Sequence, residues 1–366
     1  MFPVFEPIIT KKDINCVVKA LKAGEISGSF GENITNFERN FAKYIKSKYA
    51  VAVSSGTTAL HLAVAACEFP VGSEILISAT TNIATALAVT HNNCIPVPVD
   101  VDSLTWNIDP LLIEKKITKK TKAIIAVHFL GNPADMFTIN KIAKKFNLKV
   151  IEDSAEAHGA TFRGKKVGNL GICGCFSLYA NKIITSGEGG IITTSDRKIY
   201  EKLKLLRNLA FTKPRFKHFI RGYNFRMTGY QAAFANSQLN NIENVIKKKS
   251  NIHNLYKKYL SGVKGIAFQK ILPGNRGVYW MVGILLLSSL SKKLFVKKLE
   301  ESKIETRSFF MSMRQQPCLK KYFKRGKDLT PSSNLLWNKG LYLPSSHNLS
   351  KKNIIKICDI IKKILK

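Results

Sequence analysis

The sequence is short of acidic residues and of arginine. Among its 366 residues, 24 are Asp or Glu and 58 are Lys or Arg, which gives a net charge of +34, yet only 11 of the 58 are Arg. Proteins that read nucleic acids favour Arg, because its guanidinium grips phosphates and base edges with two hydrogen bonds. We therefore interpret the lysine excess as a bias of solvated faces and expect no nucleic-acid partner. A binding role for the charge is the alternative.

Long apolar runs and cysteine clusters are also absent. The longest apolar run, residues 278–287, is about half of the ~20 residues that a membrane-spanning helix needs. The N-terminus shows no basic segment followed by an apolar stretch. Seven scattered cysteines, of which only the pair at 173 and 175 is close, match neither a disulfide framework nor a zinc site. We expect a soluble, cytoplasmic protein with free thiols, no metal and no membrane partner.

Short apolar strands alternate with helices through the first part of the chain. Strands are expected at 49–53, 74–77, 94–99, 123–127 and 149–151, and the intervening helices include 84–89, 109–117 and 139–146. This alternation predicts an α/β fold, in which a mostly parallel sheet is covered on both faces. The pattern changes after residue 240. We therefore predict a large domain over 1–240 and a small domain over 241–366.

The second part of the chain is expected to mix helices and strands. Helices are predicted at 239–260 and 294–302, and Gly-punctuated strands within 277–287. A C-terminal helix places Ile354, Ile357, Cys358, Ile361 and Leu365 on one face. This apolar face could lie on a membrane surface. We expect it to close the small domain instead, because such stripes usually belong to a core.

Polar residues follow several of the predicted strands. Ligands bind at the carboxyl ends of the strands in sheets of this kind, and residues 54–58, His128 and 153–158 occupy those ends. Residues 55–58 begin a helix whose free N–H groups and dipole favour a phosphate, although a plain capped helix start is the alternative. The acids and the histidine of 152–158 predict a site. A solvated surface loop is the alternative there.

Lys182 lies among small and apolar residues, just before the Gly-rich turn at 187–190. A desolvated lysine has a depressed pKa and can form a Schiff base. An ordinary lysine on a helix face is the alternative. A phosphate cradle, a carboxylate and a lysine together are what pyridoxal 5'-phosphate requires, because a carboxylate keeps the pyridine nitrogen protonated. The sequence therefore predicts a pyridoxal-phosphate site.

Ordered motifs along nearly the whole chain resemble those of the DegT/DnrJ/EryC1/StrS family of sugar-nucleotide aminotransferases. They lie at 24–28, 55–61, 152–159, 182–190, 222–228, 279–281, 305–307 and 343–346. The resemblance implies the fold type I aminotransferase architecture. In that fold a large domain with a mostly parallel seven-stranded sheet, flanked by helices, carries a smaller C-terminal α+β domain. Within the family, residues 155–159 and 179–182 are most similar to the GDP-perosamine synthase branch.

The resemblance also implies a role for each cofactor-binding residue. Lys182 would be the catalytic Schiff-base lysine and the proton carrier. Asp153 would pair with the pyridine nitrogen, and Glu156 would hydrogen-bond the phenolic oxygen of the cofactor. The phosphate would be held by Gly56, Thr57, Ser177 and, from the other subunit of a homodimer, Asn224. Two shared sites would then lie at the dimer interface.

Two positions depart from the family pattern. Asn82 stands where many members stack an aromatic ring on the cofactor, so the stacking would be replaced by an amide plane or come from elsewhere. Arg314 stands where the family often has His and would grip a diphosphate, with a solvated surface Arg as the alternative. The substrate contacts that we expect come from Ser27, His128, His158 and Arg314. For His158, bracing Asp153 is an equal alternative.

The implied reaction moves an amine from glutamate to a nucleotide-linked 4-keto-6-deoxy sugar, for a surface polysaccharide or O-antigen. One alternative is a UDP- or dTDP-linked 3- or 4-keto sugar as substrate. Another is a sugar 3-dehydratase, against which Lys182 argues, because those family members carry His in place of the lysine. The last is an inactive binding protein on the same fold.

Overall fold

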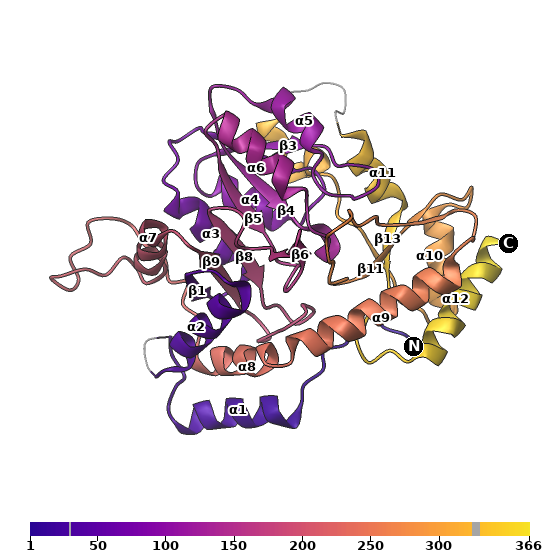
Figure 1. Cartoon of the computed structure of the whole chain (residues 1–366), viewed down its shortest axis with the longest axis horizontal. Helices are drawn as coiled ribbons and strands as arrows, with labels where there is room; N and C mark the ends of the chain where they lie inside the picture. The colour runs from indigo at the N-terminus through magenta and orange to yellow at the C-terminus, as the bar shows by residue number, and fades with distance from the viewer. Residues whose placement is uncertain (29–30, 324–329) are drawn as a thin grey trace.

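The computed structural model describes residues 1–28, 31–323 and 330–366 and is built around one large twisted sheet (Figure 1). The seven strands lie in the order β1-β9-β8-β5-β4-β2-β3. Their bounds are β1 Tyr49–Val53, β2 Glu74–Ser78, β3 Ile95–Val99, β4 Thr121–Val127, β5 Lys149–Asp153, β8 Cys173–Ser177 and β9 Gly190–Thr194. Only β9 runs antiparallel to its neighbours in this sheet. The predicted mostly parallel, seven-stranded sheet is therefore confirmed.

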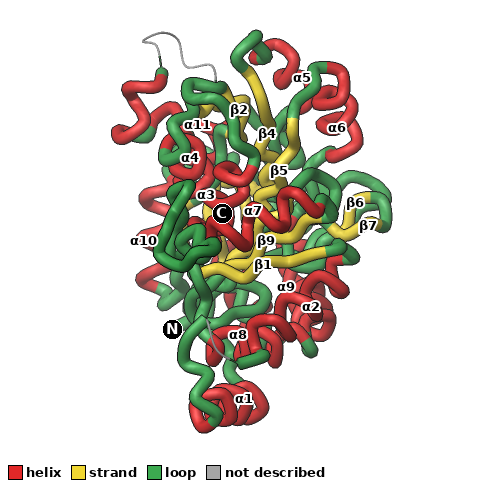
Figure 2. Tube along the Cα trace, turned by 90° about the vertical axis from the view of Figure 1, so that its left-hand side faces the viewer, coloured by secondary structure: helices red, strands yellow, loops and turns green. Residues whose placement is uncertain are grey.

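Helices cover both faces of this sheet, because alternate strand residues point to opposite sides. Ile75 and Ile77 of β2 pack into one apolar core, and Leu76 between them packs into the other. Figure 2 shows helices on either side of the strands, with α1 and α8 side by side at one edge. The bounds are α1 Lys11–Lys22, α2 Asn33–Ile45, α3 Gly56–Ala66, α4 Ile83–Thr90, α5 Pro110–Ile113, α6 Met136–Lys145, α7 Arg197–Arg207 and α8 Gly229–Leu239.

A second, antiparallel sheet of four strands forms a smaller unit near the C-terminus. Its order is β10-β11-β13-β12, with β10 Ile266–Phe268, β11 Val282–Leu286, β12 Arg307–Ser308 and β13 Gly340–Leu343. The helices of this part are α9 Ile242–Leu260, α10 Lys292–Glu301, α11 Pro331–Lys339 and α12 Lys351–Leu365. Figure 1 shows α9 leading from α8 to the side of the molecule that carries α10 and α12. The apolar face of α12 is buried in the core of this unit, as the sequence predicts.

The remaining elements are short. They are the hairpin β6 Thr161–Phe162 and β7 Lys165–Lys166, and the 3-10 turns η1 Glu114–Lys116, η2 Phe129–Gly131, η3 Met313–Gln315 and η4 Pro317–Tyr322. All seven cysteines are free thiols, as expected. In the described ranges, no helix combines the length and the apolar character needed to cross a membrane. The division into domains at residue 240 lies just before α9 and stays a prediction, since α9 contributes residues to both cores.

Three element predictions are wrong in their extent. The helix expected over 109–117 is a single α-turn, α5, followed by η1. The strand expected from residue 277 begins only at Val282, and Tyr279 before it has a left-handed backbone with φ of +52°, outside the extended region of a regular strand. The single helix expected over 239–260 is interrupted between the end of α8 and the start of α9.

Candidate active site

A cavity of about 360 Å³ opens at the carboxyl ends of the parallel strands. It gathers the loops that follow β1, β2, β5 and β8, which are far apart in sequence but adjacent at this edge of the sheet. The structure brings together in its lining all the predicted cofactor-binding residues except Asn224: Gly56, Thr57, Asn82, Asp153, Glu156, Ser177 and Lys182. The carboxyl ends of the strands therefore form one site, where the fold places ligands.

Asp153 ends β5 and is almost completely buried. Its Oδ2 accepts a 2.8 Å hydrogen bond from the hydroxyl of Thr85, and its Oδ1 accepts one of 3.2 Å from the N–H of Ala155. Burial raises the pKa of Asp153, and the hydrogen bond from Thr85 lowers it in part. The hydroxyl of Thr81 lies 2.8 Å from that of Thr85. Because the hydroxyl of Thr85 donates its only proton to Asp153, the hydroxyl of Thr81 must be the donor to Thr85.

Glu156 is buried three residues further along the same loop. Its Oε2 accepts a 2.7 Å hydrogen bond from the N–H of Leu130, in the 3-10 turn that follows β4. Leu130 adopts a left-handed backbone with φ of +56°, which is uncommon for a branched residue and turns this N–H toward the carboxylate. Burial raises the pKa of Glu156 to about 7, although the positive charge of Lys182 acts in the opposite direction.

Lys182 lies in the loop after β8, and not on a helix. Its Nζ is 4.0 Å from the centre of the Trp280 ring, which comes from the segment before β11. The indole N–H of Trp280 donates a 2.7 Å hydrogen bond to the carbonyl of Asn181 and so fixes the ring. Burial lowers the pKa of Lys182, while Glu156 and Asp153 raise it. The desolvated lysine that the sequence predicts thus has two carboxylates as counter-charges.

The start of α3 forms an anion cradle with Ser177. The first N–H groups of a helix have no intrahelical partner, and those of Gly56 and Thr57 belong to residues that line the cavity. Ser55 caps the helix by accepting a 3.1 Å hydrogen bond from the N–H of Thr58. A Cβ on residue 56 would lie 2.6 Å from Cβ of Ser177, so only glycine allows this close approach. The phosphate-binding interpretation of this turn is consistent with that geometry.

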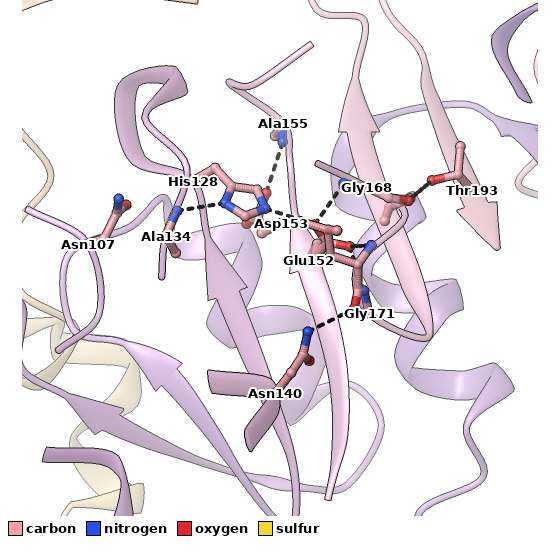
Figure 3. Close-up of polar contacts among 12 residues, drawn as sticks. Asn107, His128, Ala134, Asn140, Glu152, Asp153, Ala155, Gly168, Gly171 and Thr193 are labelled. Carbon is pink, nitrogen blue, oxygen red and sulfur yellow. Dashed lines mark hydrogen bonds and ion pairs between the residues drawn. The ribbon is translucent and has the colours of Figure 1, made fainter. Parts of the chain in front are cut away.

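His128 lies just beyond β4, as predicted, but its ring points into the protein and does not line the cavity (Figure 3). Its Nδ1 accepts a 3.1 Å hydrogen bond from the N–H of Ala134, so the ring proton is on Nε2 and is donated to Glu152 at 3.1 Å. Glu152 also accepts three backbone N–H bonds of 2.6–2.7 Å from the loop at 168–171. His128 therefore belongs to a buried hydrogen-bond network around Glu152, the residue before Asp153.

His158 is also fully buried, with its ring against those of Phe41 and Phe176 at 6.4 and 5.2 Å between centres. Burial, together with the nearby charge of Lys182, lowers its pKa to about 3, so the ring is neutral at physiological pH. Among the described residues, neither ring nitrogen of His158 forms a hydrogen bond with the side chain of Asp153, and His158 does not line the cavity. Both roles considered for it, sugar contact and brace, stay predictions.

Three predicted residues, Ser27, Arg314 and Asn224, lie outside the cavity of their own chain. Ser27 is half-buried between α1 and α2. Arg314 lies in η3, with its guanidinium 5.5 Å from the centre of the Phe323 ring. Asn224 is exposed and bridges to Asn208. Asn82 does line the cavity, but its side chain caps α4 by accepting a 3.0 Å hydrogen bond from the N–H of Ala84.

The sequence model of the DegT/DnrJ/EryC1/StrS aminotransferase family matches residues 7–362. The chain belongs to this family. It is 37% identical over 360 residues to GDP-perosamine synthase of Escherichia coli O157:H7, covering 98% of this chain and 97% of that protein. It is 38% identical over 341 residues to GDP-perosamine synthase of Caulobacter vibrioides, covering 92% and 91%. A solved structure of a GDP-4-keto-6-deoxymannose-3-dehydratase (ColD) mutant with bound GDP-perosamine superposes with a TM-score of 0.91 at 25% identity, over 100% of both chains.

The protein is thus a pyridoxal-phosphate-dependent aminotransferase, and its cavity fits the cofactor. The glycine-lined start of α3 with Ser177 would hold the phosphate, and the buried Asp153 would face the pyridine nitrogen. Lys182, with Glu156 and Asp153 as counter-charges, would offer the amine. Each of these groups suits the part of the cofactor that it would contact. N–H groups suit an anion, a carboxylate suits a protonated ring nitrogen, and a desolvated amine suits a carbonyl carbon.

Sequence reasoning missed three residues of the aminotransferase site. Thr85 holds Asp153, Trp280 covers Lys182, and Arg307 of β12 lines the cavity from the small unit. Trp280 and Arg307 lie in the motifs at 279–281 and 305–307, which resemble the family but suggest no role for either residue. The signal for Thr85 was its place four residues after Thr81, next to the start of the predicted helix at 84–89.

Proposed function

We propose that the aminotransferase converts a GDP-linked 4-keto-6-deoxy sugar into the 4-amino sugar, with glutamate as donor, for a surface polysaccharide or O-antigen. The observation that carries the proposal is the convergence of Lys182, Asp153 and Glu156 on one cavity in a chain 37% and 38% identical to two GDP-perosamine synthases. The likeness to a dehydratase solved with GDP-perosamine supports the same nucleotide and the same position of the amine.

When bound, pyridoxal phosphate supplies an electron sink for the negative charge that develops on the reacting carbon. Lys182 takes the proton from the α-carbon of glutamate in the first half-reaction and delivers one to C4 of the sugar in the second. Burial lowers the pKa of Lys182 and so favours the neutral amine, the form that can accept that proton. The Asp153 carboxylate maintains the protonated state of the pyridine nitrogen. The indole of Trp280 shields Nζ from water on one side.

We also propose a homodimer in which each cavity is completed by the neighbouring subunit. Asn224 is exposed and lies outside the cavity of its own chain, which supports its predicted place against the phosphate bound by the other subunit. The symmetric arrangement of two shared sites follows from such an exchange.

The test incubates the purified protein with pyridoxal phosphate, glutamate and GDP-4-keto-6-deoxymannose, and identifies the sugar product by mass spectrometry. The expected product is the GDP-linked 4-amino sugar. Lys182→Ala should lower turnover by about 10⁴-fold or more, because it removes both the nucleophile and the proton carrier. The exposed Lys165→Ala is the matched control and should keep full activity.

The same assay separates the alternatives. Turnover only with dTDP- or UDP-linked keto sugars would overturn the choice of nucleotide and leave the aminotransferase intact. A deoxy product without nitrogen would indicate a dehydratase. Undiminished transamination by Lys182→Ala would refute the assignment of the catalytic lysine.

A further inference from the structure

Lys249, in the middle of α9, carries an ammonium group that is buried without a counter-charge. The residue is 1% exposed, and its Nζ lies 2.7 Å from the carbonyl oxygen of Trp280 and 2.6 Å from that of Ser345. Across the described ranges of the chain, no carboxylate forms an ion pair with it. Burial lowers the pKa of Lys249 to about 7. Burying a charge without a partner ion costs free energy of folding. An apolar residue at this position would therefore be expected if stability alone mattered.

The two carbonyls that accept from Lys249 belong to different parts of the protein. Trp280 precedes β11 and lies at the wall of the cavity. Ser345 follows β13, and its Oγ accepts a 2.8 Å hydrogen bond from the N–H of Val282, so it is tied to the small sheet. Lys249 itself lies between the residues of α9 that enter the core of the large sheet, such as Ile246, and those that enter the small core, such as Ile252.

Trp280 connects Lys249 to the catalytic groups in two ways. Its indole lies over Nζ of Lys182 at 4.0 Å. Its backbone N–H donates a 3.1 Å hydrogen bond to the carbonyl of Leu130, whose own N–H donates to Oε2 of Glu156 at 2.7 Å. A continuous series of hydrogen bonds therefore runs from the buried ammonium, through the main chain of Trp280 and Leu130, to the carboxylate that faces the cofactor.

We propose that Lys249 is a positioning residue of the aminotransferase reaction. Its ammonium fixes the main chain of Trp280 to that of Ser345, and so holds the indole over Lys182 and the Leu130 N–H on Glu156. The proposal rests on the aminotransferase activity of the family and not on the identity of the sugar.

The test compares Lys249→Met, which removes the N–H donors at similar length, with Lys249→Arg, which keeps donors and charge. The exposed neighbour Lys248→Met is the matched control. Fluorine NMR of the cofactor-free protein, labelled with fluorotryptophan, reports on its three tryptophans, and Trp280→Phe assigns the signal of Trp280. We expect Lys249→Met to shift or broaden that signal and to leave those of Trp106 and Trp337 in place. Lys249→Arg should restore it in part, and Lys248→Met should change nothing.

The donor half-reaction supplies the functional readout without any sugar nucleotide. Its maximal rate should fall about tenfold or more in Lys249→Met, because small misplacements of catalytic groups are costly, while saturation by glutamate changes little. The combined Lys249→Met and Trp280→Phe variant should lose less than the product of the two single losses, since part of the effect of Lys249 acts through the indole.

An unchanged Trp280 signal in Lys249→Met, or rate losses that multiply in full in the double variant, would overturn the proposal. If Lys249→Met does not fold, Lys249→Gln keeps a neutral donor in the same place and is judged by the same signal. A chain that fails to aminate GDP-linked sugars yet shows these effects on the tryptophan signal and on the glutamate half-reaction would refute the proposed substrate and leave the role of Lys249 standing.

Discussion

The hydroxyl of Thr85 donates a 2.8 Å hydrogen bond to Oδ2 of Asp153, and it accepts one from Thr81 in turn. Thr85 lies in the first turn of α4, and Thr81 lies just before this helix, in the loop that follows β2. Asp153, which we propose to pair with the cofactor, is therefore oriented by a different strand–helix connection from the one that carries it. This arrangement makes the position of Asp153 sensitive to residues that do not touch the cofactor.

Thr85→Val should weaken the binding of pyridoxal phosphate about tenfold, because a hydrogen bond to a charged acceptor contributes about 1.5–3 kcal/mol. Loss of the bond also raises the pKa of Asp153 further, so the affinity should begin to fall at a higher pH on acidification than in the wild type. Titration of the cofactor-free protein with pyridoxal phosphate measures both effects. Thr90→Val, on the same helix, is the control. Equal affinities of Thr85→Val and the wild type would exclude a role of Thr85 in holding Asp153.

Glu156 should make the cofactor-free protein less stable as the pH rises. Its pKa is raised by burial from 4.5 to about 7, so the folded chain holds the proton over a range where the unfolded chain has lost it. The stabilisation from this proton is complete below pH 4.5 and is lost as the pH rises through about 7.

Glu156→Gln keeps an oxygen that can accept from Leu130 but never acquires the charge. We expect its Tm to exceed that of the wild type by about 2–5 °C near pH 8, and the difference to shrink near pH 5. Thermal unfolding of both cofactor-free proteins measures this. The exposed Glu201→Gln should shift Tm equally at the two pH values. A Tm difference that grows on acidification would show that the pKa of Glu156 is lowered and not raised.

His128 should matter for stability more than for substrate binding. His128→Leu removes the acceptor of the Ala134 N–H and the donor to Glu152, so we expect a loss of about 1–3 kcal/mol of unfolding free energy. His128→Gln keeps a donor toward Glu152 and should recover part of the loss. The KM for the nucleotide sugar should stay within about twofold of the wild type in both. A raised KM at unchanged Tm would instead place His128 in the sugar site, as the sequence had suggested.

The sequence predicts the large sheet and the residues at its strand ends well, for a physical reason. Parallel strands put their carboxyl ends at one edge, so Gly56, Asp153 and Ser177 converge once the strands are identified. The direction of a side chain beyond the strand end does not follow from that rule. His128 occupies the predicted place, yet its ring turns inward because Glu152 and Ala134 partner both nitrogens.

The part of the site that comes from the second unit could not be predicted from patterns. Arg307 lies in the small antiparallel sheet and Trp280 lies just before one of its strands, so the rule for the ends of parallel strands applies to neither. The conformation at Tyr279, with its positive φ, also interrupts the apolar run that suggested a longer strand. Buried Lys249 is hidden in the sequence among exposed lysines of the same helix.

Subunit complementation tests the proposed sharing of sites. Lys182→Ala lacks the catalytic amine, and Asn224→Ala lacks the proposed phosphate contact, so each homodimer should be inactive or strongly impaired. In a hybrid dimer, one cavity combines Lys182 from one chain with Asn224 from the other and is intact, while the second cavity carries both changes. Hybrids purified through two different affinity tags should therefore show about half of the wild-type activity per dimer. If Asn224 serves the cavity of its own chain, no hybrid contains an intact site and the activity stays at the level of the single variants, because each chain then carries one of the two defects.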